Sequence, residues 1–472
     1  MTPAAHAQAA LAWLAANGRP PEALGDDHPL ARAADALADA ADHGDEATRS
    51  AGLAALFGGL VEPLNDGFSV AGRAVYAAIF ARLAWRVCAR DAALTAALTR
   101  FGITSGDALR ARYERARRAS HAAPDDARRI AVLSRVTIGA DIALTSVALA
   151  RLRQRYPDAE LLLAGDAKLA GLFGGLAGVR VLPVPYGRRG PLRERFQSWI
   201  ALGDALARSS CDLVVAPDSR LDQLGVLPLI ADERRYLLWE NTQPDPARPR
   251  PLGELLDDWL RARLALPASP PALPAIALDA PNRALHERLR AALGPRPIAA
   301  VKLDHGGNPA KALPRAAEAG LLRRLRERGW RVLIDRGFGA DELANSDALL
   351  AAVGWSAVDI DDSGKALGAD AHALAARALA DAQVIRFHGS IAGWAGATAA
   401  CGLAVSYDSV GHHLAAALGV PVVTAFTGYA DPAFPIAWRP RGRGPVVVVE
   451  FTAEQKPRAP EWERWFAALP DA

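Results

Sequence analysis

Short apolar, β-branched runs alternate with helix-length segments along most of this chain, and this rhythm limits the folds open to it. Residues 129–136 form one such run, a helical pattern follows over 142–156, and a second apolar run covers 159–165. Strand, helix and strand at these lengths predict a βαβ unit with parallel strands and a right-handed crossover. Further predicted strands cover 179–184, 211–217 and 236–241. We therefore expect an open α/β sheet here.

The same rhythm restarts beyond a proline-rich stretch at 266–274, which is typical of a stiff interdomain linker. The strands predicted after it cover 297–303, 330–337, 384–389, 402–408 and 420–426, and the helices cover 316–328, 371–381, 391–401 and 412–418. This pattern predicts a second doubly wound sheet. Ligands of such sheets bind at the carboxyl edges of the strands, so we expect a small-molecule site in a cleft between two α/β domains.

The first 126 residues show helical apolar spacing and no convincing strand, so we expect an all-helical N-terminal domain over 1–126. It could serve as a scaffold or oligomerisation surface, or it could recruit a substrate. The α/β domains are predicted at 127–268 and 276–450. The tail at 451–472 contains the amphipathic segment EWERWFAAL, and we expect it to pack back on the first α/β domain as a helix.

Composition excludes several classes of protein. The 472 residues are 51% hydrophobic and 23% charged, which excludes a disordered chain, a collagen-like fibre and a disulfide scaffold. A net charge of +3 provides no strong field for nucleic acid. Three scattered cysteines without a CxxC pair indicate a reducing compartment and no structural zinc. With no basic leader and no membrane-spanning apolar run, we expect a cytoplasmic protein, at most peripheral to the inner face of the cytoplasmic membrane.

The segment 406–421 carries the strongest chemical signal. A predicted strand ends at Tyr407, and a loop containing Asp408, Ser409 and Gly411 opens a helix. Free N–H groups and partial positive charge at a helix N-terminus suit a diphosphate, and His413 in the first turn could point at the same anion. Asp408 could accept hydrogen bonds from sugar hydroxyls. Alternatively, Ser409 or Asp408 only caps the helix and His413 lies on its surface.

A glycine-containing loop follows the strand at 297–303. Gly306 and Gly307 would let backbone approach a ligand, and Lys311 would supply a point charge for phosphate. The loop is not a Walker A motif, because GxxxxGK[ST] is absent. The alternative is a solvated lysine.

Two segments of the first α/β domain add candidates. Asp141, in Gly139-Ala140-Asp141, could act as general base on an acceptor hydroxyl or cap a helix beginning at Ile142. A basic loop follows the strand at 179–184, and its arginines suit a phosphorylated or acidic partner unless the loop is simply solvated. Its candidate acceptor-binding residues are Arg188, Arg189 and Arg193. No GxGxxG follows a predicted strand, so a dinucleotide oxidoreductase has little support.

The run from 129 to 165, the Lys311 loop and DSVGHHLAAALGVPVVTAF occur in an order that resembles family 9 glycosyltransferases. These are ADP-heptose:lipopolysaccharide heptosyltransferase-like enzymes of bacterial surface-glycan synthesis. The resemblance covers about 129–450 and implies a GT-B fold. Its two Rossmann-like domains would face a cleft, with 127–268 as the acceptor domain and 276–450 as the nucleotide-sugar domain.

The resemblance also implies roles for individual residues. Asp141 resembles the base that deprotonates the acceptor, Lys311 resembles the lysine on the donor phosphate, and Asp408 resembles the aspartate that holds the donor sugar. The diphosphate would meet Ser409, Val410, Gly411 and His413. Either Asp341 or Glu342 would hold the ribose, and the sequence leaves that choice open.

Two departures stand out. Val410 replaces the usual glycine after Asp-Ser, and Ala140 is an extra residue before Asp141. The acidic run 359–362 is predicted as a solvated loop, so we expect neither a metal site nor a cofactor. The sequence therefore predicts an inverting, metal-independent glycosyltransferase that moves a heptose-like sugar from a nucleotide-diphosphate donor, ADP-heptose by resemblance, to a glycan or other hydroxyl acceptor. A degenerate protein that binds nucleotide or glycan without turnover, and a structural partner subunit, remain the alternatives.

Overall fold

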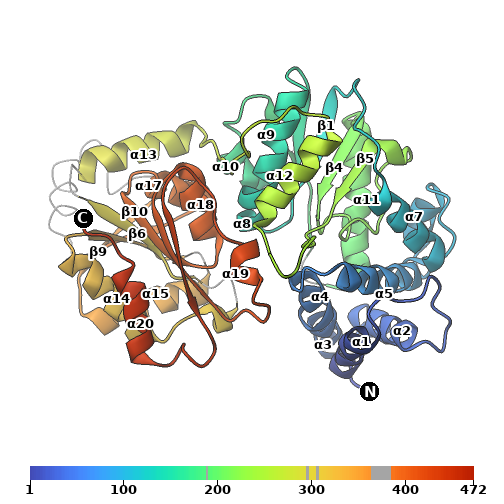
Figure 1. Cartoon of the computed structure of the whole chain (residues 1–472), viewed down its shortest axis with the longest axis horizontal. Coiled ribbons are helices and arrows are strands. Elements are labelled where there is room, and N and C mark those ends of the chain that lie inside the picture. The colour runs from blue at the N-terminus through green and yellow to red at the C-terminus, as the bar shows by residue number, and fades with distance from the viewer. Residues whose placement is uncertain (188–189, 294–296, 305–307, 338, 363–383) are drawn as a thin grey trace. The chain divides into compact units, whose positions relative to one another are not determined.

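The computed structural model describes residues 1–187, 190–293, 297–304, 308–337, 339–362 and 384–472 (Figure 1). The chain divides into two compact units. Unit 1 comprises Met1–Thr137, Ala148–Ala167 and Gly178–Ala272. Unit 2 comprises Ile138–Val147, Lys168–Ala177 and Leu273–Ala472. The boundary near 272 lies in the proline-rich stretch, where residues 266–279 form neither helix nor strand.

Unit 1 begins with helices, as the apolar spacing predicts. They are α1 (Pro3–Asn17), α2 (Pro29–Ala41), α3 (Glu46–Leu56), η1 (Phe57–Val61), α4 (Glu62–Asp66), α5 (Val70–Cys88), α6 (Ala92–Thr99) and α7 (Gly106–Arg118). Helix α5 is the most buried of them, and it begins where Ser69 Oγ accepts a hydrogen bond from Gly72 N at 2.9 Å.

A five-stranded parallel sheet follows in the order β3-β2-β1-β4-β5. Its strands are β1 (Arg129–Leu133), β2 (Glu160–Gly165), β3 (Val179–Pro183), β4 (Leu213–Pro217) and β5 (Tyr236–Trp239). The helical elements over 138–263 are α8 (Ile138–Ala140), η2 (Asp141–Thr145), α9 (Ser146–Arg155), η3 (Ala167–Leu169), α10 (Ala170–Phe173), α11 (Leu192–Arg208), η4 (Glu233–Arg235) and α12 (Leu252–Arg263).

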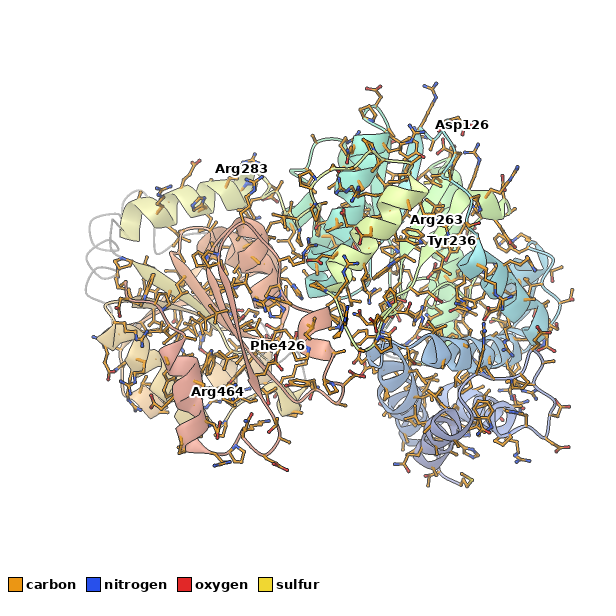
Figure 2. All side chains as sticks on the ribbon, in the orientation of Figure 1. Asp126, Tyr236, Arg263, Arg283, Phe426 and Arg464 are labelled. Atoms are coloured by element: carbon orange, nitrogen blue, oxygen red, sulfur yellow. The ribbon has the colours of Figure 1, made fainter. Side chains whose placement is uncertain are left out.

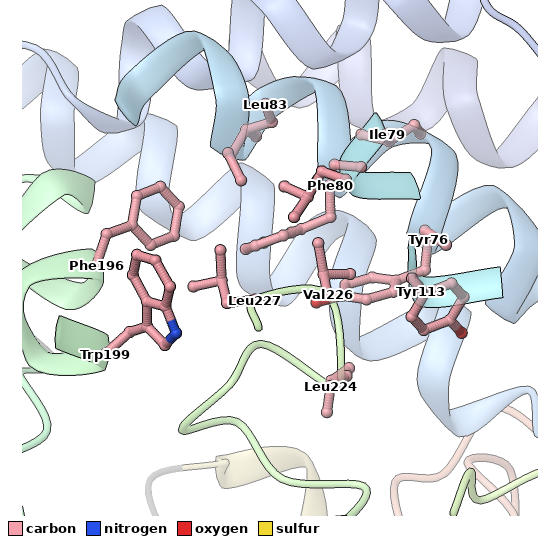
Figure 3. Close-up of a cluster of buried hydrophobic side chains, with 14 of the residues drawn as sticks. Tyr76, Ile79, Phe80, Leu83, Tyr113, Phe196, Trp199, Leu224, Val226 and Leu227 are labelled. Atoms are coloured by element: carbon pink, nitrogen blue, oxygen red, sulfur yellow. The ribbon is translucent and has the colours of Figure 1, made fainter. Parts of the chain in front are cut away.

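The N-terminal helices and this sheet share one hydrophobic core. Aromatic side chains join them: Phe80 of α5 stacks on Tyr76 at 5.1 Å between ring centroids and meets the edge of Phe196 of α11 at 6.3 Å (Figure 3). Trp199 of α11 donates to Pro228 O at 2.7 Å beside them. Continuous burial therefore makes the helices part of unit 1.

A buried ion-pair network lies at the carboxyl ends of β1 and β4, where the strand order of the first sheet reverses. Arg73 of α5, 1% exposed, pairs with Asp218 at 2.6 Å and donates to Asn65 Oδ1 at 3.0 Å. Asp218 is fully buried and also pairs with Arg135 at 3.0 Å. A helix of the N-terminal region thus fills part of the sheet edge at which α/β domains usually bind ligands.

Unit 2 contains a seven-stranded parallel sheet in the order β12-β11-β10-β6-β7-β9-β8. Its strands are β6 (Ile298–Lys302), β7 (Arg331–Asp335), β8 (Ala357–Asp361), β9 (Val384–His388), β10 (Leu403–Tyr407), β11 (Val422–Thr427) and β12 (Val446–Phe451). Its helices include α13 (Ala280–Leu293), η5 (Pro309–Lys311), α14 (Arg315–Glu327), α15 (Ala340–Val353), α17 (Ile391–Thr398), α18 (Val410–Leu418), α19 (Phe434–Ala437) and α20 (Ala459–Ala467). The predicted helix at 371–381 lies outside the described residues.

Three features of unit 2 differ from the sequence predictions. Strand β12 was not expected, and neither was β8, which takes up most of the acidic run predicted as a loop. Asp359 on β8 pairs with Arg386 of β9 at 2.6 Å, so the charge is compensated across the sheet. The tail helix α20 packs on unit 2 and not on the first α/β domain, because its apolar face completes the core beside β10: Trp465 stacks on Tyr407 at 5.7 Å.

Candidate functional site

The strand order of unit 2 reverses between β6 and β10, which lie side by side as parallel neighbours. Ligands of open α/β sheets bind at the carboxyl ends of the strands beside such a reversal. Lys302 ends β6 and Tyr407 ends β10, directly before Asp408. The predicted donor residues therefore gather where the topology favours a ligand.

The N-terminus of α18 is built as expected. Ser409 is extended, with φ −155° and ψ −174°, and its Oγ accepts a hydrogen bond from Gly411 N at 3.3 Å. The helix begins at Val410, and Gly419 closes it in the left-handed region at φ 80°. The first-turn N–H groups and the positive end of the helix dipole make this turn suited to an anion.

Gly411 lies in close contact with two strands. A Cβ at this position would lie 3.2 Å from Cβ and Cδ of Lys302 and 3.3 Å from Cβ of Ser406. The missing side chain therefore lets the first turn of α18 approach β6 and β10 closely. The adjacent Val410 is partly exposed at the start of the same turn.

Lys311 and Asp408, predicted as separate donor contacts, form an ion pair through Nζ and Oδ2. Lys311 Nζ also donates to the backbone oxygen of Asp408 at 3.3 Å and lies 5.5 Å from the ring centroid of Phe434. Tyr407 holds the lysine loop, because its hydroxyl accepts from Leu313 N at 3.0 Å. The pair sets a cation and a carboxylate beside one helix N-terminus.

Two adjacent histidines lie inside this turn. His413 is 5% exposed, so the alternative of a helix-surface histidine is wrong. His412 is fully buried: its Nδ1 lies 3.1 Å from Thr424 Oγ1, and its Nε2 lies 3.8 Å from Asp408 Oδ1. Its ring stacks on Phe426 of β11 at 5.5 Å between ring centroids. Figure 2 labels Phe426 among the side chains of unit 2.

Burial keeps both imidazoles neutral. Desolvation, assisted by the Lys311 charge, lowers the pKa of His412 to about 3. Desolvation, followed by the neighbouring His412, lowers the pKa of His413 well below its ordinary value. At neutral pH, any contact of His413 with an anion would therefore be a hydrogen bond from a neutral ring.

Asp141 does not cap a helix at Ile142, because the helical segment already begins at Ile138. The carboxylate is 1% exposed, and its Oδ1 accepts from Thr145 Oγ1 at 2.8 Å. Residues 141–145 form a π-helical turn that begins directly after Ala140, and Ser146 N donates to Asp141 O across it.

The Asp141 segment packs against α18 within unit 2. A Cβ on Gly139 would lie 3.3 Å from both Val410 Cα and His413 Cδ2. The predicted base therefore belongs to the same compact unit as the predicted donor residues, in a segment that touches the first turn of α18.

Lys302 and Asp335 are site residues that the sequence analysis missed. Lys302 is 5% exposed and pairs with Asp335 at the end of β7. Burial opposes its charge, but Asp335 and then Asp304 raise the pKa of Lys302 above its ordinary value. The sequence signal that could have identified them is a charged residue at the end of each of two apolar strands, β6 and β7. Because the Lys302 side chain packs against Gly411, the Lys302–Asp335 pair lies directly beside the first turn of α18.

The two ribose candidates differ in the structure. Glu342 Oε2 accepts from Gly339 N at 3.0 Å at the start of α15, whereas Asp341 is exposed. Arg193, in unit 1, pairs with Asp42 of the N-terminal region at 2.8 Å. The other predicted residues, Arg188, Arg189, Gly306 and Gly307, lie outside the described residues.

Within the described residues, no group of three or more His, Cys, Asp or Glu side chains is arranged to hold a metal ion. In the same part of the chain, no helix is long and apolar enough to cross a membrane.

Comparison with known proteins finds similar architectures among solved structures. The chain is similar to the ADP-heptose lipopolysaccharide heptosyltransferase II of E. coli, with 17% identity, 72% of this chain and 98% of that chain covered, and a TM-score of 0.47. It is similar to a family 9 glycosyl transferase from Veillonella parvula, with 16% identity, 70% and 89% coverage, and a TM-score of 0.48. The E. coli heptosyltransferase WaaC, solved with ADP, gives 16% identity, 72% and 99% coverage, and a TM-score of 0.47. No family model and no curated protein matches.

Proposed function

We propose that this chain is a GT-B glycosyltransferase that moves a sugar from a nucleotide-diphosphate donor to an acceptor hydroxyl. The observation that carries the proposal is the Lys311–Asp408 pair beside the capped N-terminus of α18. A nucleotide sugar needs neutralisation of the diphosphate and hydrogen bonding of the sugar within a few ångströms of each other. This turn offers both kinds of group.

In the proposed reaction, the diphosphate binds the first-turn N–H groups of α18, from Ser409 to Gly411, with Lys311 as counter-charge. His413 donates a hydrogen bond as a neutral imidazole, and Asp408 accepts from the sugar hydroxyls. These groups stabilise the leaving diphosphate, the role that a divalent metal has in other transferases. We therefore propose metal-independent transfer, and ADP-heptose as the donor to test first.

Asp141 is proposed as the base. It would take the proton of the acceptor hydroxyl as that oxygen attacks the anomeric carbon, and the nucleoside diphosphate would leave from the opposite face with inversion. The partial burial of the surrounding turn would keep competing water away. The acceptor is proposed to be a bacterial surface glycan such as the lipopolysaccharide core. We propose that this acceptor is contacted by Arg188, Arg189 and Arg193. The proposed location is cytoplasmic, at most peripheral to the inner membrane.

Thermal unfolding in the presence of ADP, UDP, GDP, dTDP or CDP tests the donor site. A nucleotide at a hundred times its dissociation constant stabilises the protein by about 2.7 kcal/mol. We expect a shift with one nucleotide that is lost in Lys311→Ala and His413→Ala and kept in Arg324→Ala, which removes an exposed arginine of α14. No shift with any nucleotide would refute the donor site and favour a structural subunit.

Turnover separates an enzyme from a degenerate nucleotide-binding protein. Asp141→Asn should abolish transfer from ADP-heptose to a lipopolysaccharide-core acceptor while leaving ADP affinity unchanged, and EDTA should not slow the wild type. Binding of ADP without any transfer, by wild type and variant alike, would favour the degenerate protein.

A further inference from the structure

A cavity of about 480 Å³ lies in the N-terminal region of unit 1, between α2, α5 and the start of α7. Its volume is in the range of small-molecule sites. The lining includes Asp35, Arg82, Trp85, Arg86, Arg90 and Gly106. This cavity belongs to a different unit from the proposed donor site, and the proposed function makes no use of it.

One wall consists of arginine–carboxylate pairs between α5 and α2, two helices that lie side by side (Figure 1). Arg82 binds Asp35 through two hydrogen bonds, Nε to Oδ1 at 2.9 Å and Nη2 to Oδ2 at 2.7 Å. One turn further along, Arg86 of the lining binds Asp39, which does not itself line the cavity, at 2.8 Å for both bonds. The Arg82–Asp35 pair therefore sets a planar donor and a carboxylate side by side on the wall.

Such pairs match adjacent hydroxyl groups. A hydroxyl donates one hydrogen bond and accepts others, so it can give its proton to a carboxylate and accept from the guanidinium beside it. The side chains of Arg82 and Asp35 are each 24% exposed, which leaves them accessible. Arg82 faces both Asp35 and Asp26, and Arg86 and Arg90 share Asp39, so most of the positive charge of this wall is compensated. Arg110, also in the lining, donates to the backbone oxygens of Pro21 and Glu22.

Trp85 contributes an apolar surface to the same cavity. It is partly buried and lies one turn from Arg82 on α5 and one turn from Ala89, which caps the end of that helix. Gly106 brings α7 against this part of α5, because a Cβ there would lie 3.1 Å from Arg82 Cα and 3.5 Å from Trp85 Cβ. An aromatic face beside paired polar groups is suited to a ligand with one C–H face and a rim of hydroxyls.

We propose that this cavity binds an uncharged pyranose saccharide, with its C–H face on Trp85 and its hydroxyls on the Arg82–Asp35 pair. Helix α5 also carries Arg73 of the buried network at the first sheet. The saccharide would therefore be held by a region that is packed firmly on the sheet of unit 1. The proposal goes beyond the proposed function, because it needs neither nucleotide nor turnover.

Calorimetric titration of the full chain with neutral hexose and heptose mono- to trisaccharides tests the site. We expect the affinity for the saccharide to fall at least tenfold in Trp85→Ala and in Asp35→Asn. Trp85→Phe should keep most of the wild-type affinity. Trp13→Phe is the matched control, since Trp13 packs on the same helical core and does not line the cavity. It should bind like wild type.

Two results would overturn the proposal: no binding of any neutral saccharide by the folded wild type, or binding that Trp85→Ala leaves unchanged. Preference for phosphorylated or uronic sugars over all neutral ones would overturn it as well. ADP titration of the same samples keeps the two proposals apart, because the donor site should respond to Lys311→Ala and not to Trp85→Ala.

Discussion

Removal of the Arg73 guanidinium should loosen the N-terminal helices from the first sheet. In Arg73→Met the side chain keeps a similar length, but Asp218 loses the partner at 2.6 Å and Asn65 loses a donor at 3.0 Å. Asp218 is fully buried, so water cannot replace the arginine. Breaking a buried pair by removing one partner costs about 3–5 kcal/mol. Because Asp218 keeps Arg135 at 3.0 Å, we expect a loss at the lower end of that range, about 3 kcal/mol, from unit 1.

The matched control is Arg115→Met. Arg115 of α7 also links the helical region to the α/β part of unit 1, through Glu233 at 2.8 Å, but its side chain is 61% exposed. A pair this exposed contributes at most about 1 kcal/mol. Urea unfolding followed by circular dichroism measures both variants, and limited proteolysis reports cleavage between α7 and β1, which should increase in Arg73→Met alone.

Arg73→Met combined with Asp218→Asn completes the cycle. Asn tolerates the left-handed backbone that Asp218 adopts at φ 58°, and it removes the carboxylate charge that Arg73→Met leaves with Arg135 as its partner at 3.0 Å, so the double variant should lose less stability than the two single variants added together. Equal losses in Arg73→Met and Arg115→Met, or strict additivity in the cycle, would refute the idea that this network joins helices and sheet.

Three further outcomes are expected. Burial raises the pKa of Asp222 from 3.8 to about 6 despite its hydrogen bond from Tyr236, so the native state holds this proton more tightly than the unfolded chain does. Its contribution to the stability of unit 1 is complete below pH 3.8 and is lost as the pH rises through 6, and Asp222→Asn should flatten this slope in urea titrations at pH 4 to 7. For His412 the sign is opposite: its pKa falls from 6.5 to about 3, so its neutral form stabilises unit 2 above pH 6.5 and this contribution is lost on acidification towards pH 3. His412→Gln should reduce the acid sensitivity of unit 2 in thermal scans, and an unchanged pH profile would contradict its buried neutral state. Gly411→Ala places a Cβ 3.2 Å from Lys302 and should cost about 1–3 kcal/mol of unit 2 stability, measured by urea unfolding. The variant should also bind ADP more weakly in a calorimetric titration. Wild-type stability together with wild-type ADP affinity would contradict the close approach of α18 to β6.

Local patterns predicted most of unit 2 because each depends on a few neighbouring residues. The strand ending at Tyr407, the cap at Ser409 and the stop at Gly419 are set by backbone preferences within one short segment. Strands β8 and β12 were missed for the converse reason. The acidic residues of β8 find compensating arginines only after the sheet has assembled, and no local signal distinguishes them from a solvated loop.

The sequence alone determined that this chain forms two parallel α/β sheets preceded by helices, because hydrophobic periodicity and turn residues act over short distances. Only the tertiary structure decided which side chains meet. Three contacts join segments that lie far apart along the chain. They are the pairing of Lys311 with Asp408, the packing of Lys302 against Gly411, and the packing of α20 on unit 2. Those contacts depend on strand order and on the shape of the assembled core, and neither is encoded in the spacing of residues along any one segment.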